Sequence, residues 1–452
     1  MWSRAPAQGP LPVIRGLPRG SEWRREVLRT NLWLVPAVEV VAAVVLFAAT
    51  YALDRAAFAG DFRLPGWVLS GSPDAARQIL IAIAAAIITV IGVVFSMVIV
   101  ALTLASTQFG PRMLRNFIRD RGTQVTLGTF VATFVYAVLV LGAFGQGGPG
   151  FVPHISVAVT LTLTVADLAV LIYFLHHIAT QIQLPQVIAG IAGDLAGAIE
   201  LQAGRGAAGS GARSAARLLA GMDGPGGEVA APRSGYLQYI QRALLVRLAS
   251  ERGVVIHLRC RPGHFLVQGH AYATVWPADA AERVAQDLSR AHVTGPYRTL
   301  AQDVSFGVDQ LVEICIRALS SAVNDTFTAL TCVDWIGDSL CKVAGRWQPT
   351  RVYRDAAGAV RVITTEATWE RLVQRACDKV RQASAGMPAV MIRQLGALAK
   401  VVERTPAGRE RQVLLDQADM IERLSAATVR EAADRADISR AYALVVTAAR
   451  AG

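Results

Sequence analysis

Charged residues are scarce in this sequence. Asp, Glu, Lys and Arg make up only 17% of the 452 residues, whereas 53% are hydrophobic. A soluble globular chain carries about 25% charged and about 45–50% apolar residues. The shortage of charge excludes a disordered or fibrous protein and indicates that part of the chain lies in a lipid bilayer. The length allows two or three domains, so a membrane region and a water-facing region are both expected.

Lysine and cysteine are also rare. Only 3 of the 45 basic residues are lysines, which is typical of coding from a GC-rich genome. The net charge of +11 is not gathered into a basic patch with interleaved aromatic residues, so no nucleic acid is expected as a partner. The cysteines are odd in number and show no CxxC spacing, which predicts free thiols in a reducing compartment. They are Cys260, Cys315, Cys332, Cys341 and Cys377.

Catalytic and cofactor motifs are absent from the sequence. There is no Walker loop, no nucleophile elbow, no GxGxxG before a helix and no HExxH. His257, His264 and His270 match no zinc-binding spacing, and a polar solvent-facing surface is the simpler interpretation. We therefore predict no enzyme activity, no metal and no cofactor.

Four long apolar runs lie in the first 180 residues, each long enough for the helix of about 20 residues that crosses a membrane. They cover residues 32–53, 78–105, 124–144 and 155–176. The first run contains Glu39 and is too long for a cleavable signal peptide, so it is expected to remain as a span.

The predicted fold is an α-helical membrane region followed by a cytoplasmic α+β domain that is mostly helical. Four transmembrane helices occupy residues 32–180, after a cytoplasmic N-terminal segment over 1–31. A connecting helix and a Gly-rich flexible linker cover 181–233. An α+β subdomain with a β-hairpin is predicted over 234–300, and a mainly helical domain over 301–452.

Arginine placement predicts the orientation in the membrane. Short loops rich in Lys and Arg stay in the cytoplasm. Arginines precede the first span and lie between the second and third, whereas the loop 145–153 carries no charge. Both termini are therefore predicted to be cytoplasmic. Arg112, Arg115 and Arg119 share one helical face, which predicts a short interfacial helix near 111–121.

Small and hydroxyl residues recur every seven positions in the second span, which places them in one narrow stripe. The stripe comprises Ala82, Thr89, Ser96, Thr103 and Gly110. Small residues let transmembrane helices approach closely, so ordinary helix packing explains the stripe. The same residues would line a pore or hydrated cavity in a homo-oligomer. Both interpretations stay open.

Polar residues also occur at membrane depth in the other spans. An ionisable group at the bilayer centre costs about 2.5–3.5 kcal/mol on insertion scales, so such groups should face protein or water. Asp167 is either a functional group or the partner of a structural hydrogen bond to a Thr or Tyr of a neighbouring span. The polar residues are Glu39 in the first span, Thr129, Thr133 and Tyr136 in the third, and Thr160, Thr164 and Asp167 in the fourth.

Strand and helix patterns alternate after residue 233. Residues 234–240 and 254–260 are predicted to be extended, with a helix over 241–251 between them. Arg261-Pro262-Gly263-His264 suits a type II turn, so 264–267 is expected to return as the hairpin partner of 254–260. A β-ribbon is predicted near 350–364.

A polar cluster is expected around the helix pair 303–340. It is a candidate site for a small ligand or a partner protein, although capping and ion pairing explain the same residues without a ligand. Asp325 is a natural N-cap for the helix that begins at Thr326. The expected members are Arg298, Gln302, Asp303, Arg317, Asn324 and Asp325.

Several of these segments resemble a known family. Residues 105–112 (ASTQFGPR), 119–124 (RDRGTQ), 234–238 (SGYLQ) and 324–329 (NDTFTA) are similar to motifs of a bacterial predicted membrane protein family, domain of unknown function 2254. The resemblance covers nearly the whole chain. It implies a bacterial inner-membrane protein with a cytoplasmic domain and supplies no activity. The family's loop usually has two prolines and a glycine where this chain has Ser321, Thr326 and Ala322.

Two functional hypotheses follow. The leading one is a homo-oligomeric channel- or transporter-like conduit that is lined by the second-span stripe and modulated by the cytoplasmic domain. The alternative is a membrane-anchored cytoplasmic sensor or scaffold, which binds a small ligand or a partner protein. Neither hypothesis identifies the ion or the ligand.

Overall fold

The computed structural model describes residues 33–59, 73–109, 120–144, 151–203 and 212–451. The chain divides into two compact units, and the boundary falls between Gly190 and Ile191. We call the described residues up to Gly190 the membrane unit and those from Ile191 on the C-terminal unit. The predicted interfacial helix, with Gly110, Arg112, Arg115 and Arg119, lies outside the described residues.

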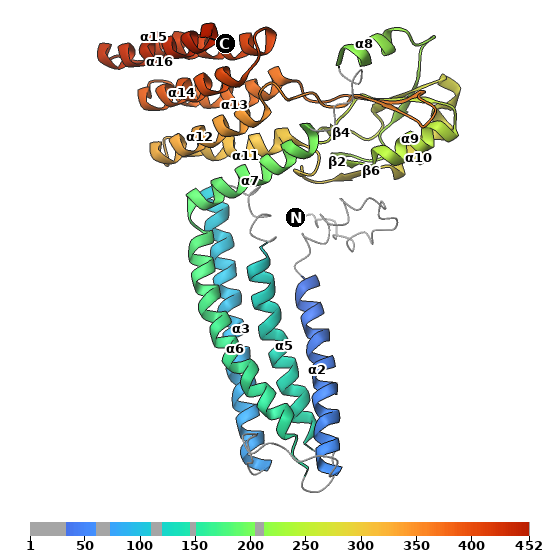
Figure 1. Cartoon of the computed structure of the whole chain (residues 1–452), viewed down its shortest axis with the longest axis vertical. Coiled ribbons are helices and arrows are strands. Elements are labelled where there is room, and N and C mark those ends of the chain that lie inside the picture. Colours follow the sequence, from blue (N-terminus) through green and yellow to red (C-terminus); the bar gives the residue numbers. More distant parts are fainter. Residues whose placement is uncertain (1–32, 60–72, 110–119, 145–150, 204–211, 452) are drawn as a thin grey trace, which may run out of the picture. The chain divides into compact units, whose positions relative to one another are not determined.

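The membrane unit contains four long apolar helices that run alongside one another (Figure 1). They are α2 (Leu34–Ala59), α3 (Pro73–Phe109), α5 (Arg121–Ala143) and α6 (His154–Gln181). Helix α5 packs against the other three and is the most buried of them. Apolar side chains cover the outward faces of the unit, as expected for helices that contact lipid.

A fifth helix, α7 (Leu184–Ala203), follows α6 and contains the boundary between the units. Within the described part of the chain, five helices are long and apolar enough to cross a membrane, and α7 is the least apolar of them. The sequence predicted four spans and a connecting helix. Helix α7 carries Asp194 and Glu200, and its Leu195 lies against Gly307 of the C-terminal unit. Length and composition alone therefore do not separate α7 from the four predicted spans.

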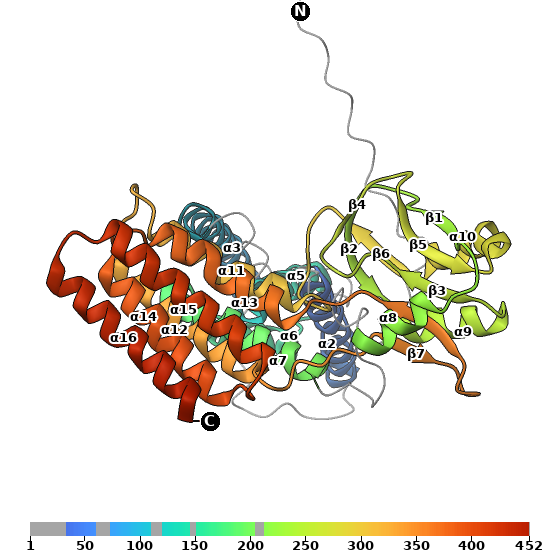
Figure 2. The ribbon, with the colours of Figure 1, turned by 90° about the horizontal axis from the view of Figure 1, so that it is seen from above.

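The C-terminal unit begins with an α/β lobe that holds two small sheets (Figure 2). The larger sheet has the order β1-β5-β3-β8-β7, and the smaller one has the order β4-β2-β6. Helices α9 (Arg242–Glu251) and α10 (Ala281–Arg290) belong to this lobe. The strands are β1 (Gly227–Ala230), β2 (Gly235–Ile240), β3 (Val255–Leu258), β4 (Phe265–Leu266), β5 (Ala271–Trp276), β6 (His292–Gly295), β7 (Val352–Arg354) and β8 (Val360–Thr364).

Two sequence predictions for this lobe are wrong in part. Strand β4 pairs with β2 rather than with β3, so the predicted β3–β4 hairpin does not form. Both edges of β3 are already occupied, because β5 pairs with it antiparallel and β8 pairs with it parallel. The predicted linker also contains ordered elements, namely helix α8 (Ala212–Ala220) and strand β1. The larger sheet therefore contains three strands from outside the predicted 234–300 segment, namely β1, β7 and β8.

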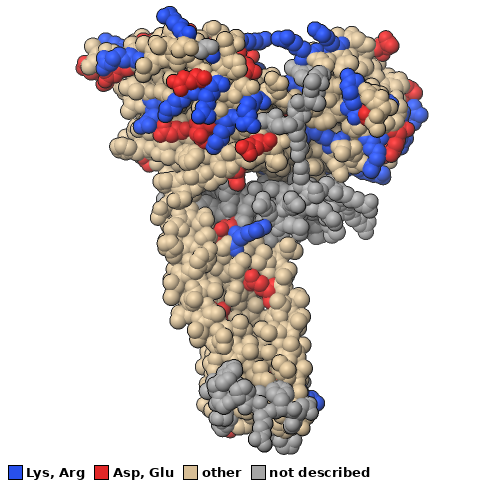
Figure 3. All heavy atoms as spheres, in the orientation of Figure 1, with Lys and Arg blue, Asp and Glu red and all other residues tan. Residues whose placement is uncertain are grey.

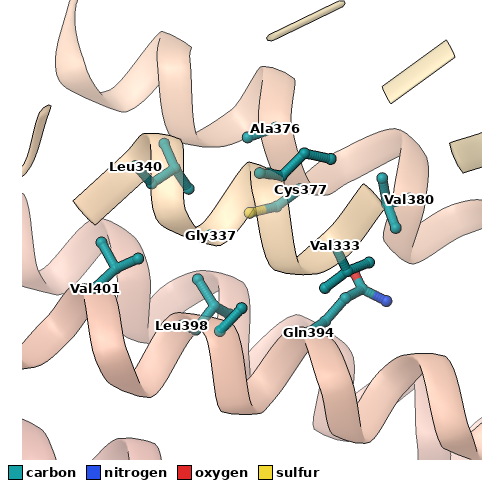
Figure 4. Close-up of a pocket in the computed structure, with 11 residues that line it drawn as sticks. Val333, Gly337, Leu340, Ala376, Cys377, Val380, Gln394, Leu398 and Val401 are labelled. Atoms are coloured by element: carbon teal, nitrogen blue, oxygen red, sulfur yellow. The ribbon is translucent and has the colours of Figure 1, made fainter. Parts of the chain in front are cut away.

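Six helices form the rest of the C-terminal unit (Figure 2). Their interior is closely packed: a cavity of about 20 Å³ lies between α12, α13 and α14, lined by apolar side chains and Gln394 (Figure 4). A cavity of this size holds about one water molecule and no larger ligand. The helices are α11 (Val304–Ala318), α12 (Thr326–Val343), α13 (Trp369–Ala383), α14 (Pro388–Arg404), α15 (Arg409–Thr428) and α16 (Ala432–Ala451).

All five cysteines are free thiols, as the sequence predicted. Cys315, Cys332 and Cys377 are buried, whereas Cys260 and Cys341 are partly exposed. Burial raises the pKa of the Cys377 thiol to about 12, so this thiol is protonated and unreactive at neutral pH.

Candidate functional site

The hydroxyl stripe of α3 faces away from the other helices of this chain. Thr89, Ser96 and Thr103 are all exposed, and nothing lies within 4 Å of a Cβ added at Gly92. The Oγ1 atoms of Thr89 and Thr103 donate to the carbonyls of Ala85 and Ile99 at 2.8 and 2.9 Å. These two hydroxyl groups are satisfied by their own helix, so they can face lipid without a hydrogen-bonding cost. Among the residues that the structure describes, these three positions of the stripe therefore do not pack against another helix.

A second set of polar groups lies inside the membrane unit, at successive levels along the buried face of α5. We call this set the polar column. Its levels are centred on Asp54, Asp167 and Glu39, and its end lies at Asp120. Thr129, Thr133 and Tyr136 of α5 contribute to these levels.

Asp54 organises the first level of the polar column. Although it lies near the end of α2, only 3% of it is exposed. It accepts from the backbone N–H groups of Ile155 and Ser156 at 2.7 and 3.0 Å, so it caps the start of α6. The Ser156 hydroxyl bonds both Asp54, at 2.6 Å, and Thr50, at 3.1 Å. Thr50 in turn lies 2.8 Å from the Tyr136 hydroxyl. This network connects α2, α5 and α6.

Sequence reasoning missed Asp54, which lies directly after the first predicted span, 32–53. A carboxylate at the end of an apolar run is a weak signal. Its partners lie about 100 residues further along the chain, at a helix start that the sequence does not mark with a capping side chain, because the N-cap is Pro153.

Asp167 occupies the middle level of the polar column. It is 4% exposed and accepts from the Thr133 hydroxyl at 3.2 Å. Its second carboxylate oxygen is buried without a hydrogen-bond partner among the described residues. The hydrogen bond agrees with the structural alternative for Asp167, and the remaining oxygen leaves capacity for a proton or another donor.

Thr160 and Thr164 continue the polar face of α6 near Asp167. Their hydroxyls donate to the backbone carbonyls of Ser156 and Thr160 at 2.9 and 2.8 Å. Thr160 is fully buried, whereas Thr164 is partly exposed. Each side chain keeps an acceptor lone pair for a neighbouring donor.

Glu39 lies against α5 at the third level. The Thr129 hydroxyl donates to Glu39 at 3.5 Å, and a Cβ at Gly128 would overlap the Glu39 carboxylate. Gly128 therefore lets this side chain approach the backbone of α5 closely. Beyond Glu39, Asp120 caps α5 by accepting from the Thr123 N–H at 2.7 Å, and it also lies 2.7 Å from His177 of α6.

The three carboxylates inside the membrane unit share an electrostatic property. In the part of the chain that the structure describes, none of Asp54, Asp167 and Glu39 forms a salt bridge. Their partners are hydroxyl and backbone N–H groups only. Asp54 and Asp167 are buried, whereas Glu39 is partly exposed.

The candidate residues of the C-terminal unit do not form one cluster. Arg298 and Asp303 lie together, 2.6 Å apart, in a larger set that we call the ion-pair cluster. Asp309 contacts both Arg298 and Arg375 at 2.5 and 2.6 Å, and Arg261 lies 3.6 Å from Asp303. The cluster joins loops of the α/β lobe to helices α11 and α13. Its guanidinium and carboxylate groups pair with one another, so its geometry is that of a structural contact.

Gln302 has a separate role beside β2. Its side-chain amide accepts from the Ile240 N–H at 2.9 Å and donates to the Ile240 carbonyl at 3.1 Å, as a neighbouring strand would. A backbone-pairing role therefore accounts for both ends of its amide.

Arg317, Asn324 and Asp325 lie at the opposite end of α11, about 20 Å from Asp303 by the helical rise. Asp325 caps α12, because it accepts from the Thr328 N–H at 3.0 Å and from the Thr328 hydroxyl at 2.6 Å. These hydrogen bonds lower the pKa of the Asp325 carboxyl. Asn324 has a φ of 50°, a conformation that Asn tolerates. Ala322, which stands where the family has glycine, does not have a positive φ, so this position does not require glycine here.

In neither unit do the described side chains form a metal-binding group. Among the residues with described positions, no group of three His, Cys, Asp or Glu side chains could hold a metal ion. The charged side chains gather on the C-terminal unit, whereas the long helices show almost none (Figure 3).

The several apolar helices and the mixed C-terminal unit define a membrane protein. The chain matches the family described as "Predicted membrane protein (DUF2254)" over residues 29–400. Uncharacterized proteins of Mycobacterium bovis and Mycobacterium tuberculosis are each 30% identical to it over 381 residues, which cover 82% of this chain and 71% of theirs. No solved structure matches. The chain therefore belongs to the DUF2254 family, and the resemblance noted in the sequence is confirmed.

Proposed function

We propose that this protein conducts protons through the interior of its membrane unit, with Asp167 as the central protonation site. The observation that carries the proposal is Asp167 itself: a carboxylate buried at the middle of an apolar helix, with one hydroxyl partner and one unpartnered oxygen. Ionisable residues inside membrane spans are costly and are typical of proton and ion pathways.

The polar column supplies the steps on either side of Asp167. The hydroxyl groups of Ser156, Thr50 and Tyr136 form a chain that ends at the Asp54 carboxylate, and each hydroxyl can accept one proton while it donates another. On the other side, Thr129 with Glu39 and then Asp120 with His177 continue the series of titratable groups. In each step a proton leaves one oxygen, or the Nε2 of His177, as another proton arrives there, so no co-reactant is needed.

This proposal moves the conduit from the α3 stripe to the interior beside α5. The stripe then has a different role in the leading hypothesis: its exposed small residues suit a close contact with α3 of a second copy. A homo-oligomer with one conduit in each protomer is therefore part of the proposal, as is modulation by the C-terminal unit.

Proton flux in vesicles tests the proposal. The full chain is reconstituted with a pH-sensitive dye inside, and a potassium gradient with valinomycin drives protons inward. We expect the rate of acidification to fall at least tenfold in Asp167→Asn, which cannot ionise, and to be largely kept in Asp167→Glu. Thr162→Val is the matched control, because Thr162 lies on the same helix but is exposed.

The triple variant T89L/S96L/T103L separates the two conduits. Flux that survives in this variant and is lost in Asp167→Asn supports the interior column. Flux that survives in Asp167→Asn contradicts the interior column. Loss of flux in the triple variant alone would support a conduit lined by the α3 stripe instead.

The alternative, a membrane-anchored sensor that binds a small ligand, is favoured by a different observation. The C-terminal unit contains an open groove of about 860 Å³ that is lined by arginines.

A further inference from the structure

The groove lies between helix α8, the segment that precedes β7, and the first turns of α13 and α15. Its volume of about 860 Å³ is within the range of ligand pockets in proteins, which is about 300–1,000 Å³. Four of the side chains that line it are cationic: Arg213, Arg217, Arg351 and Arg409. We call it the arginine groove.

Helix α8 holds two of these arginines in place. Ala215, Leu218 and Leu219 of α8 pack against Val352 and Ile363, which belong to β7 and β8. This buried face fixes the rotation of the helix. Arg213 and Arg217, four residues apart, therefore share another face and line the groove from the same side.

The α8 arginines carry charge that the described part of the chain does not neutralise. Arg213 and Arg217 are exposed, and neither guanidinium forms a hydrogen bond or ion pair with any residue whose position is described. Arg409, by contrast, lies 3.7 Å from Glu370. Glu370 and Glu410 also line the groove, so four positive charges face two negative ones there.

Two helix starts line the groove, and the start of α13 is capped by the Thr368 hydroxyl, which accepts from the Arg371 N–H at 3.2 Å. Helices α13 and α15 begin at Trp369 and Arg409, and both residues line the groove. The N-cap of α15 is Gly408, so no side chain accepts from the first N–H groups of that helix. Helix starts with free N–H groups attract anions, and phosphates in particular.

Polar and aromatic groups complete the lining. Ser214, Gln348 and Thr368 offer neutral hydrogen-bonding groups. The indole N–H groups of Trp347 and Trp369 already donate to the carbonyls of Ala367 and Glu410, at 2.8 and 3.0 Å. These two side chains thus act as rigid walls rather than as donors for a ligand.

We propose that the arginine groove binds a phosphate-bearing ligand, either a soluble phosphorylated metabolite or a phospholipid headgroup. Guanidinium groups bind phosphate through paired N–H donors, and the groove presents them from three different elements. A single carboxylate would engage only a small part of this lining, whereas a pyrophosphate or a substituted phosphate spans more of it. This site is independent of proton movement in the membrane unit.

Calorimetric titration of the full chain with inorganic pyrophosphate tests the proposal. The protein is held in nanodiscs of zwitterionic phosphatidylcholine. We expect binding that weakens as salt rises, and at least tenfold weaker binding in the double variant R213Q/R217Q. Both side chains are exposed, so this variant should fold, which an unchanged melting profile would verify.

The matched control is R247Q/R283Q, which removes the same charge from exposed helix positions elsewhere. The proposal is supported if this control binds pyrophosphate within twofold of wild type. It is overturned if wild type shows no binding, or if both double variants lose affinity equally. Nanodiscs that contain phosphatidylglycerol identify the source of the phosphate: competition with pyrophosphate supports a lipid headgroup, and its absence supports a soluble ligand.

Discussion

His264 shows how the charge of the ion-pair cluster acts on a single residue. Burial and the neighbouring Arg261, Arg298 and Arg375 lower the pKa of His264 to about 4, so it is neutral in the folded protein at pH 7. In the unfolded chain its pKa is about 6.5. Between pH 6.5 and 4 the unfolded state therefore binds more protons, and the free energy of unfolding falls as the pH falls.

We expect His264→Gln to reduce this pH dependence. Between pH 7 and 5 the C-terminal unit should lose about 1–2 kcal/mol less stability in the variant than in wild type, after allowance for the partial exposure of the ring. The measurement is the melting temperature of the full chain in nanodiscs at both pH values. His270→Gln, at an exposed position, is the control. An unchanged pH dependence in His264→Gln would contradict the assignment.

At the scale of residues, the sequence showed which polar side chains lie at membrane depth. It did not show contacts that depend on where distant segments meet in space. A hydrogen bond from Asp167 to a Thr or Tyr of a neighbouring span was one of two alternatives for this residue, and the structure contains such a bond with Thr133. Asp54 gave no such signal, because its role depends on where the start of α6 lies in space. The arginine groove was likewise unpredictable, since its cations come from three elements that only the fold brings together.

At the scale of elements, the segment Arg261–His264 shows that the sequence can predict a turn without predicting which strand pairs with the segment that follows it. The turn itself was predicted correctly: the His264 N–H donates to the Arg261 carbonyl at 3.0 Å, and Gly263 has a φ of 92°. The pairing partner of the following strand, β4, was predicted wrongly, because a turn does not determine which strand edge is free. Occupation of both β3 edges sends β4 to the other sheet.

Gly263→Ala should destabilise the C-terminal unit strongly. A Cβ at this position would overlap the Asp303 carboxylate, which the ion-pair cluster holds in place. The φ of 92° adds conformational strain of about 1–2 kcal/mol for a residue with a Cβ. We expect a total loss of about 3 kcal/mol or more in the free energy of unfolding.

Gly269→Ala is the control for this change. Gly269 also has a positive φ, of 81°, but nothing lies within 4 Å of an added Cβ there. Chemical unfolding of the full chain should show at least about 2 kcal/mol more destabilisation in Gly263→Ala than in Gly269→Ala. Equal effects would mean that strain alone matters and that the contact with Asp303 does not.

At the scale of the whole molecule, hydropathy predicted the apolar helices but not their exact number. The four predicted spans overlap α2, α3, α5 and α6, and α7 also meets the criteria of length and composition. A periodic apolar stripe that packs on protein resembles one that faces lipid, and α7 has buried Ile191, Leu195 and Ile199 on one side. Sequence composition alone cannot distinguish these two environments.

The two compact units have separate hydrophobic cores, so we expect them to unfold in two thermal transitions. Asp303→Ala should lower only the transition of the C-terminal unit, by about 3 kcal/mol, because it leaves the largely buried Arg261 without its carboxylate partner and Arg298 with Asp309 alone. Ser156→Ala should lower only that of the membrane unit, by about 1 kcal/mol, through the lost hydrogen bonds to Asp54 and Thr50. Scanning calorimetry of the full chain in nanodiscs measures both. If each substitution shifted both transitions equally, the chain would unfold as one cooperative body, contrary to this division.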